Sequence, residues 1–182
     1  MSNLYVITGP AGVGKTTISK KLAENKSKSV LIEGDQIYSQ VIGSYVSAWK
    51  EGNHLDVFWK ICLDMIDTYL SAGYDVVFNY IITLNSYIKI KERFKNYTTK
   101  FVVLLVDEKT ILERDRQRPI DCQMNERCIV LLNNFKNTNY QKDYFLHLVG
   151  CSLQKSGNQL CWWNAGIFKK FHAAIHKRKS SC

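Results

Sequence analysis

Residue types and spacing suited to holding phosphate occur near the N-terminus, in the stretch Gly9-Pro10-Ala11-Gly12-Val13-Gly14-Lys15-Thr16-Thr17. The stretch fits the pattern G-x-x-x-x-G-K-[ST]. Glycine has no Cβ and reaches positive φ, so backbone N–H groups in such a loop can turn inward around phosphate oxygens. Lys15 is expected to reach the β- and γ-phosphates, and the Thr16 hydroxyl to ligate Mg²⁺. We predict that the nucleotide is held by Gly9, Ala11, Gly12, Val13, Gly14, Lys15, Thr16 and Thr17.

The residues on either side of this loop favour the same interpretation. Residues 4–7 are a short apolar run, typical of a strand buried on both faces. After the loop, Ile18 and Leu22 recur at helical spacing. A strand, a glycine loop and a helix, in that order, is the context in which this motif binds phosphate. The alternative is a glycine turn that holds no ligand.

Apolar runs and helical periodicity alternate along the rest of the chain. Strands are predicted at 29–32, 75–80, 101–106 and 144–149. Helices are predicted at 55–72, ending before Gly73, at 85–95, capped by Asn85 or Ser86, from Asp107 to near Pro119, and at 124–137. Strands alternating with helices at this spacing indicate βαβ units, and hence an α/β fold with a doubly wound parallel sheet.

Polar residues follow three of the predicted strands: Asp35, Asn79 and Asp107. Open parallel sheets bind ligands at the carboxyl ends of their strands, so these residues are candidates for the site. The carboxylate of Asp35 can accept the proton of an attacking hydroxyl or hold a water of Mg²⁺. The alternative is that Asp35 caps a helix, which is also the role predicted for Asp107. Asn79 stands where many proteins with this loop carry a metal-binding acid.

A cluster of arginines follows the fourth predicted strand, in Arg114-Asp115-Arg116-Gln117-Arg118-Pro119. On a helix, Arg114 and Arg118 would lie one turn apart on the same face. Their guanidinium groups would then close on the phosphates and stabilise charge that develops during phosphoryl transfer. We predict both as catalytic residues and Arg114 also as a nucleotide contact. The alternative is a solvated helix face.

Residues 36–57 lie between Asp35 and the next predicted helix, so they are the candidates for binding an acceptor. Their side chains suited to this are Tyr38, Trp49, His54 and Asp56. The alternative for each of them is a purely structural role. We expect the acceptor to be a small molecule.

The composition is that of a folded chain, with 182 residues, 46% hydrophobic and 23% charged. No apolar run approaches the ~18 residues that a membrane span needs. The six cysteines show no metal-ligand spacing and are expected to be reduced thiols, with Cys122 and Cys128 as possible core residues. We expect a cytoplasmic protein without a signal peptide or a membrane partner.

The formal net charge of +9 is unevenly distributed. Up to Asp143 the chain has 19 basic and 16 acidic residues, and after Asp143 it has six basic residues and no acid. We therefore predict a main domain at residues 1–149 and a basic, poorly patterned tail of the same domain at residues 150–182.

Together, several of these stretches resemble the small P-loop kinases, which include gluconate, shikimate and adenylylsulfate kinases and chloramphenicol phosphotransferase. The resemblance rests on the loop at 9–17, on E-G-D at 33–35 and on L-E-R-D-R-Q-R-P at 112–119. A D-x-Q-M-x-E-R-C stretch at 121–128 is similar to bacterial gluconate-kinase-like, AAA-type ATP-binding proteins. The resemblance covers about residues 3–143 and departs from the family at Asn79, in place of a Walker B acid, and after Asp143.

The resemblance implies a three-layer α/β/α fold with a five-stranded parallel sheet in the order 2-3-1-4-5. It also implies ATP and Mg²⁺ as cofactors, Asp35 near the acceptor hydroxyl, and Arg114 and Arg118 in a lid. The function we predict is a phosphotransferase that moves the γ-phosphate of ATP to a hydroxyl of a small metabolite. Two alternatives remain: a nucleotide-binding protein without turnover whose basic tail docks on RNA or a protein, and a polynucleotide 5′-kinase.

Overall fold

The computed structural model describes residues 2–48, 50 and 52–138, and the backbone of residues 145–147, 154–156 and 159–161. The chain forms two compact units. The first contains residues 1–7 and 18–100, and the second contains residues 8–17 and 101–182. The glycine loop therefore belongs to the second unit, whereas Asp35 and Asn79 belong to the first.

The first unit is built on three strands, β1 (Asn3–Thr8), β2 (Ser29–Glu33) and β3 (Asp75–Asn79). β3 pairs in parallel with both neighbours, so that Val76 lies opposite Leu4 on one side and opposite Val30 on the other. Residues 4–8 of β1 and 76–79 of β3 are buried, whereas β2 is half-buried over most of its length. This is why β1 and β3 read as continuous apolar runs in the sequence.

The helices of this part of the chain are α1 (Lys15–Glu24), α2 (Gly34–Tyr38), α3 (His54–Ser71) and α4 (Leu84–Arg93). α3 packs against β2 and β3 and buries Phe58, Cys62, Ile66 and Leu70, which recur every four residues. α4 is joined to α3 by an ion pair of 2.7 Å between Arg93 and Asp64. The prediction of a helix at 55–72 is thus confirmed to within one residue at each end.

α3 ends as its glycine predicts. Gly73 has a φ of 82°, and its N–H donates to the Leu70 carbonyl at 3.0 Å, while the Tyr74 N–H donates to the Tyr69 carbonyl at 3.0 Å. The rings of Tyr69 and Tyr74 lie 5.7 Å apart and supply the apolar contact that accompanies this arrangement. The helix therefore ends in a Schellman motif.

The start of α4 differs from the prediction. The N-cap is Thr83, whose side chain accepts a hydrogen bond from the Ser86 N–H, and not Asn85 or Ser86 themselves. Thr83, Asn85 and Ser86 are all residue types that cap helices, so residue type alone could not predict which of them is the N-cap.

The second unit contains β4 (Thr98–Leu105, from Phe101), α5 (Glu108–Arg116), the 3₁₀ turn η1 (Ile120–Cys122) and α6 (Glu126–Asn137). α5 packs on α6. The short strand β5 (Phe145–His147) pairs in parallel with β4, and β6 (Gln154–Ser156) pairs in antiparallel fashion with β7 (Gln159–Cys161). The fifth strand, predicted at 144–149, is therefore present over Phe145–His147, and the rest of the predicted range lies outside the described residues. The side chains of the basic tail lie outside the described residues.

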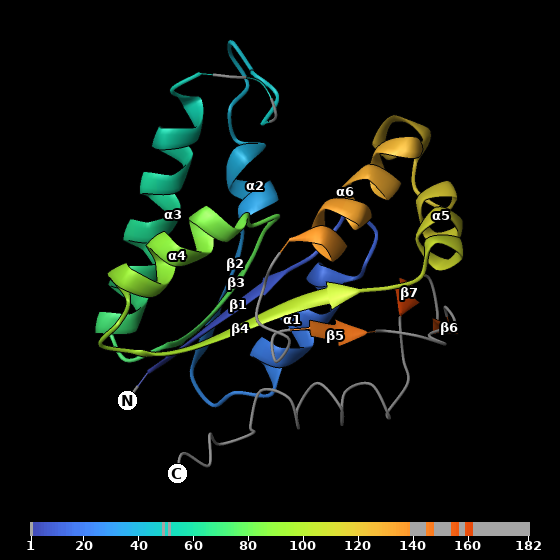
Figure 1. Cartoon of the computed structure of the whole chain (residues 1–182). Coiled ribbons are helices and arrows are strands. Elements are labelled where there is room, and N and C mark those ends of the chain that lie inside the picture. Colours follow the sequence, from blue (N-terminus) through green and yellow to red (C-terminus); the bar gives the residue numbers. More distant parts are fainter. Residues whose placement is uncertain are drawn as a thin grey trace. The chain divides into compact units, whose positions relative to one another are not determined.

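The strands follow the order β2-β3-β1-β4-β5. This is the predicted order, and every pairing described within that sheet is parallel. Figure 1 shows α3 and α4 on one side of the strands of the first unit and α1 on the other. The predicted α/β fold with a doubly wound parallel sheet is confirmed. Among the described residues, no helix combines the length and the apolar character that crossing a membrane requires.

Candidate nucleotide and acceptor sites

The glycine loop has the conformation that its sequence predicts. Gly9 has a φ of 144°, and a Cβ there would lie 2.4 Å from the Leu104 carbonyl oxygen, so the backbone of the loop approaches β4 too closely for any other residue. Gly14 has a φ of 101° and open space where its Cβ would stand. The loop is thus shaped by positions that favour glycine, and it leaves room above Gly14, as a cradle for phosphate requires.

Lys15 places a positive charge inside this loop. Its side chain is only 8% exposed, and its Nζ donates to the carbonyl oxygens of Gly9 and Pro10 at 3.0 Å each. An ammonium group held by carbonyl groups of the loop is ready to exchange these for phosphate oxygens, which are stronger acceptors. Thr16 is exposed in the first turn of α1, and Thr17 is half-buried beside it.

Arg114 braces the same loop from α5. It is 6% exposed, and its Nη1 donates to the Val13 carbonyl oxygen at 3.0 Å. The Ile111 side chain, one turn earlier on α5, lies nearest to where a Cβ of Gly12 would stand, at 3.6 Å. The predicted proximity of Arg114 to the nucleotide loop is therefore present in the structure, although the contact that it makes there is with the loop backbone.

The prediction that Arg114 and Arg118 share one helix face is wrong. α5 ends at Arg116, with Gln117 as its C-cap, so Arg118 lies beyond the helix. Its Nη1 donates to the Cys122 carbonyl oxygen at 3.1 Å. The reason lies in Pro119, because a residue that precedes proline is disfavoured in the helical conformation.

Asp115 was not singled out from the sequence, yet it organises the segment after α5. Its carboxylate is almost fully buried and accepts hydrogen bonds from the N–H groups of Met124, at 2.9 Å, and Asn125, at 2.7 Å. Arg118 lies 3.6 Å from it. One buried acid thus fixes both ends of residues 118–125. Charge patterning could not show this, because every neighbouring arginine was an equally good partner.

Asp107 caps α5, as predicted. Its Oδ1 accepts from the Thr110 N–H and its Oδ2 from the Thr110 hydroxyl, both at 2.8 Å. The hydrogen bond from the Thr110 N–H, followed by the one from its hydroxyl, lowers the pKa of the Asp107 carboxyl. Asp107 is therefore a structural residue at the start of the helix that carries Arg114.

In the first unit, a carboxylate lies next to Asn79 at the end of the sheet. Glu33 of β2 is the register partner of Asn79, and the Asn79 Nδ2 donates to the Glu33 Oε1 at 3.2 Å. The other oxygen of Glu33 accepts from Gln36 at 2.5 Å. Asn79 is fully buried, so its amide orients Glu33. From the E-G-D stretch at 33–35, Asp35 was selected as a site residue, and Glu33 was not.

Asp35 is exposed and is the second residue of α2. The N-cap position belongs to Glu33, so the alternative that Asp35 caps a helix is wrong. Burial, and after it the negative charge of Asp35, raises the pKa of Tyr80. A Cβ at Gly34 would lie 2.5 Å from the Tyr80 ring, which explains why glycine precedes Asp35.

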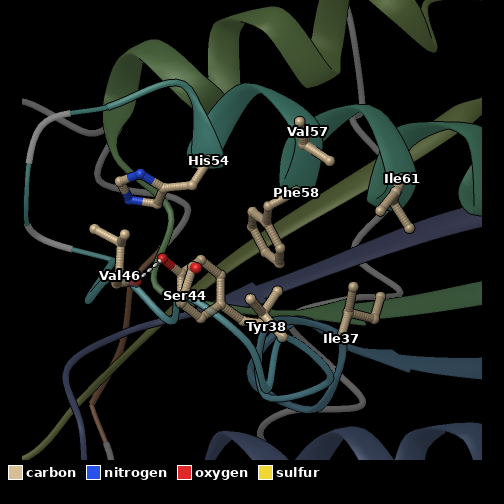
Figure 2. A pocket seen from close by; sticks show the side chains of 9 residues that line it. Ile37, Tyr38, Ser44, Val46, His54, Val57, Phe58 and Ile61 are labelled. Atoms are coloured by element: carbon tan, nitrogen blue, oxygen red, sulfur yellow. Dashed lines mark hydrogen bonds between the residues drawn. The ribbon is translucent and has the colours of Figure 1, made fainter.

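A pocket opens between α2, the segment after it and α3 (Figure 2). It has a volume of ≈ 410 Å³, including its open mouth, and its lining includes Ile37, Tyr38, His54, Val57, Phe58 and Ile61. Of the predicted acceptor candidates, Tyr38 and His54 line it, and Asp56 is exposed at the start of α3. Trp49 lies outside the described residues.

No group of three His, Cys, Asp or Glu residues among the described residues is arranged to hold a metal ion. Mg²⁺ in nucleotide enzymes keeps several waters and binds through phosphates and one or two protein oxygens. The exposed hydroxyl of Thr16 beside the loop fits that kind of site. Of the cysteines that the structure describes, Cys62 and Cys128 are buried, Cys122 is exposed, and all three are free. Of the two cysteines considered as core thiols, Cys128 is therefore one and Cys122 is not.

A family model described as an AAA domain matches residues 4–127. The chain belongs to this family. The match includes the glycine loop, Asp35, Asn79, Arg114 and Arg118, that is, every residue predicted to take part in the site. None of the curated proteins compared with the sequence matches it.

Solved structures share the fold of this AAA-domain protein. A shikimate kinase from Acinetobacter baumannii, in complex with shikimate, is 17% identical over 100% of this chain and 96% of its own, with a TM-score of 0.58. A gluconokinase from Sinorhizobium meliloti 1021 is 16% identical over 81% and 82%, with a TM-score of 0.57. A chain of the Pnkp1/Rnl/Hen1 RNA repair complex is 12% identical over 86% of this chain and 53% of its own, also with a TM-score of 0.57. The resemblance to the small P-loop kinases is thus confirmed for the fold.

Proposed function

We propose that this AAA-domain protein is an ATP- and Mg²⁺-dependent phosphotransferase that transfers the γ-phosphate to a hydroxyl of a small molecule. The observation that carries the proposal is Lys15, a buried cation bonded to the carbonyl groups of a loop whose glycines are in the phosphate-binding conformation. The likeness of the fold to a gluconokinase and a shikimate kinase supports a small acceptor.

Two residues of the loop and two arginines outside it have roles in this reaction. Lys15 and the inward N–H groups of the loop hold the β- and γ-phosphates and draw negative charge toward the leaving oxygen. The Thr16 hydroxyl holds Mg²⁺, which supplies further neutralisation of phosphate charge when it is bound. Arg114 keeps the loop in shape through the Val13 carbonyl. Arg118 belongs to the segment that covers the nucleotide.

The acceptor half of the reaction is assigned to Asp35. Its exposed carboxylate follows the second strand, where parallel sheets place their chemistry. Asp35 takes the proton of the acceptor hydroxyl as the oxygen bonds to the γ-phosphorus and the bond to the β-phosphate oxygen breaks, leaving ADP. Glu33, which accepts hydrogen bonds from Asn79 and Gln36, fixes the end of β2 directly before the helix that carries Asp35.

The test has two steps. Calorimetry with ATP and Mg²⁺ measures nucleotide affinity, and a panel of alcohols, sugar acids, polyols and nucleosides is then tested for acceptor-dependent ADP release. We expect binding in the first step and release above the acceptor-free rate in the second. Absence of ATP affinity in the wild-type protein overturns the proposal. ATP binding without release for any acceptor favours the alternative of a nucleotide-binding protein without turnover.

A polynucleotide 5′-kinase is the second candidate. The likeness to a chain of an RNA repair complex and the net charge of +9 favour it. Binding of a polynucleotide acceptor would weaken steeply as salt rises, because each neutralised phosphate releases counterions. Transfer to a 5′-hydroxyl oligonucleotide with this salt dependence, and none to small alcohols, would select it.

A further inference from the structure

The pocket between α2 and α3 is apolar in a way that restricts what can occupy it. The nine described residues that line it include no lysine, arginine, aspartate or glutamate, and most of them are aliphatic or aromatic. Figure 2 shows Val57, Phe58 and Ile61 of α3 facing Ile37 and Tyr38 across the hollow. Val57 is 58% exposed and Ile61 is 45% exposed at its edge. Large apolar side chains that a fold leaves open around a pocket are covered most favourably by an apolar ligand.

Few polar groups line the pocket, and one of them, the Tyr38 hydroxyl, is already in a hydrogen bond within the protein. The Tyr38 hydroxyl donates to the Val46 carbonyl oxygen, so it is engaged within the pocket wall. The Nε2 atom of His54 is buried and has no hydrogen-bond partner among the residues that the structure describes. A buried polar atom without a partner costs about 1–3 kcal/mol, so a ligand that bonds to it removes that cost. Besides the hydroxyl of Ser44, the described part of the pocket therefore offers the Nε2 of His54 as a buried polar contact on an apolar surface.

A sugar acid or a polyol fits these walls poorly. A carboxylate would lose its hydration against these walls, and the described residues of the lining include no lysine or arginine to pair with it. A polyol would bury several hydroxyls against Ile37, Val57 and Ile61, which offer no hydrogen bonds. An uncharged molecule with an apolar body and one hydrogen-bonding group besides the reacting hydroxyl avoids both costs.

We propose that the acceptor is an uncharged, largely apolar alcohol whose aliphatic or aromatic body occupies this pocket and whose polar substituent bonds to the Nε2 of His54. This rests on the proposed phosphotransferase function, and it names the substrate class that the function leaves open. In the reaction, the hydroxyl oxygen of the alcohol bonds to the γ-phosphorus, its proton goes to Asp35, and ADP leaves. The product is a phosphate monoester of an apolar alcohol.

The experiment compares two groups of acceptors on the full chain with saturating ATP and Mg²⁺. The apolar group is 2-(4-hydroxyphenyl)ethanol and 4-hydroxycinnamyl alcohol, which have a second polar group for His54, and 2-phenylethanol, which lacks it. The polar group is gluconate, shikimate and glycerol. ADP release is measured for each acceptor, and saturation-transfer NMR measures the binding of 2-phenylethanol independently of turnover. ATP affinity, measured by calorimetry, reports separately on the nucleotide half of the proposed function.

Variants with a matched control locate the binding. Ile61→Lys places a charge at the edge of the pocket, and Ile88→Lys makes the same change on α4 at a residue that is 55% exposed and does not line the pocket. Both sites are open to solvent, so both variants are expected to fold. We expect Ile61→Lys to lower kcat/KM for the apolar alcohols by at least ~10-fold and Ile88→Lys to leave it unchanged. His54→Phe is expected to raise KM, and His54→Gln to restore part of the loss.

Several outcomes would overturn the inference. Transfer to gluconate or shikimate in preference to the apolar alcohols would overturn it while the phosphotransferase function stands. Equal losses in Ile61→Lys and Ile88→Lys would show that the pocket is not where the alcohol binds. Binding of 2-phenylethanol without phosphorylation of any alcohol in the panel would show that the ligand of this pocket is not an acceptor. Absence of ATP affinity would reject the proposed function itself.

Discussion

The Nη1 of Arg114 donates to the carbonyl oxygen of Val13 at 3.0 Å, although the two residues are 101 positions apart in the chain. Both belong to the second unit, and Arg114 is buried. This hydrogen bond is to a backbone carbonyl, so it depends on the backbone conformation of the loop and not on which side chain residue 13 carries. The shape of the phosphate loop is therefore tied to α5 and to the Asp107 cap at which that helix begins.

Replacing Arg114 by methionine keeps most of its apolar stem and removes the bond to Val13. We expect unfolding to require about 1–3 kcal/mol less free energy, because the buried carbonyl of Val13 loses this donor. ATP affinity should fall as well, since the loop is less well held. Chemical denaturation and calorimetry measure the two effects. Arg116→Met, at an exposed residue of α5, is the control, and an Arg114→Met variant that matches it in both measurements would contradict the bracing role.

Lys15→Ala removes the ammonium that lies inside the loop. We expect phosphoryl transfer to fall by at least ~10²-fold, the effect of removing one electrostatic group aimed at the developing charge. The decrease in ATP affinity measures how much of the phosphate binding comes from Lys15 and how much from the loop N–H groups. Single-turnover kinetics and calorimetry measure these quantities. Lys20→Ala changes an exposed lysine of the same helix and should have neither effect; turnover in Lys15→Ala equal to that of Lys20→Ala would refute the assignment.

Asp35→Asn tests the proposed base. Because Glu33 holds the N-cap position of α2, the variant should melt within a degree or two of the wild type and bind ATP normally. We expect transfer to slow by ~10²–10⁴-fold, the usual contribution of a general base. Asp67→Asn alters an exposed acid of α3 that is not a candidate for the site, and it serves as the control. Near wild-type transfer by Asp35→Asn would mean that another group takes the proton.

The Asp107 cap gives the fold a dependence on acid. Its pKa is lowered in the folded state, chiefly by the hydrogen bond from the Thr110 N–H, so its contribution is complete above its unfolded pKa of roughly 3.9. That contribution is lost as the pH falls through the folded pKa. Asp107→Ala should cost about 1 kcal/mol at neutral pH and progressively less below pH ~4. Urea unfolding at pH 7 and pH 3 measures the difference, and a cost that is the same at both pH values would contradict it.

The fold was largely predictable because its elements are strongly patterned. β1, β3 and β4 are buried on both faces and therefore appear as unbroken apolar runs, and α3 repeats its buried residues every four positions. The start of α4 was placed incorrectly because Thr83, Asn85 and Ser86 are all residue types that cap helices. Which of them caps the helix depends on where the backbone changes from extended to helical conformation, and residue type alone does not show this.

The part of the candidate site that depends on local backbone conformation was predictable from the sequence. The part that depends on contacts between residues brought together by folding was not. The loop conformation follows from its glycines. The place of Arg118 could have been inferred from Pro119, which disfavours helix at the residue before it. The roles of Asp115 and Glu33 depend on which N–H groups and amides come near them after folding, and nothing in their sequence neighbourhood distinguishes them from other acids.

The hydrogen bond from the Tyr38 hydroxyl to the Val46 carbonyl closes the segment after α2 on itself before any ligand arrives. A wall that is already in place does not have to be ordered during association. The approach to equilibrium should then follow a single exponential, with an observed rate that rises linearly with ligand concentration from the dissociation rate and reaches no plateau. Tyr38→Phe would release the segment, and a slow, saturating phase would enter the time course.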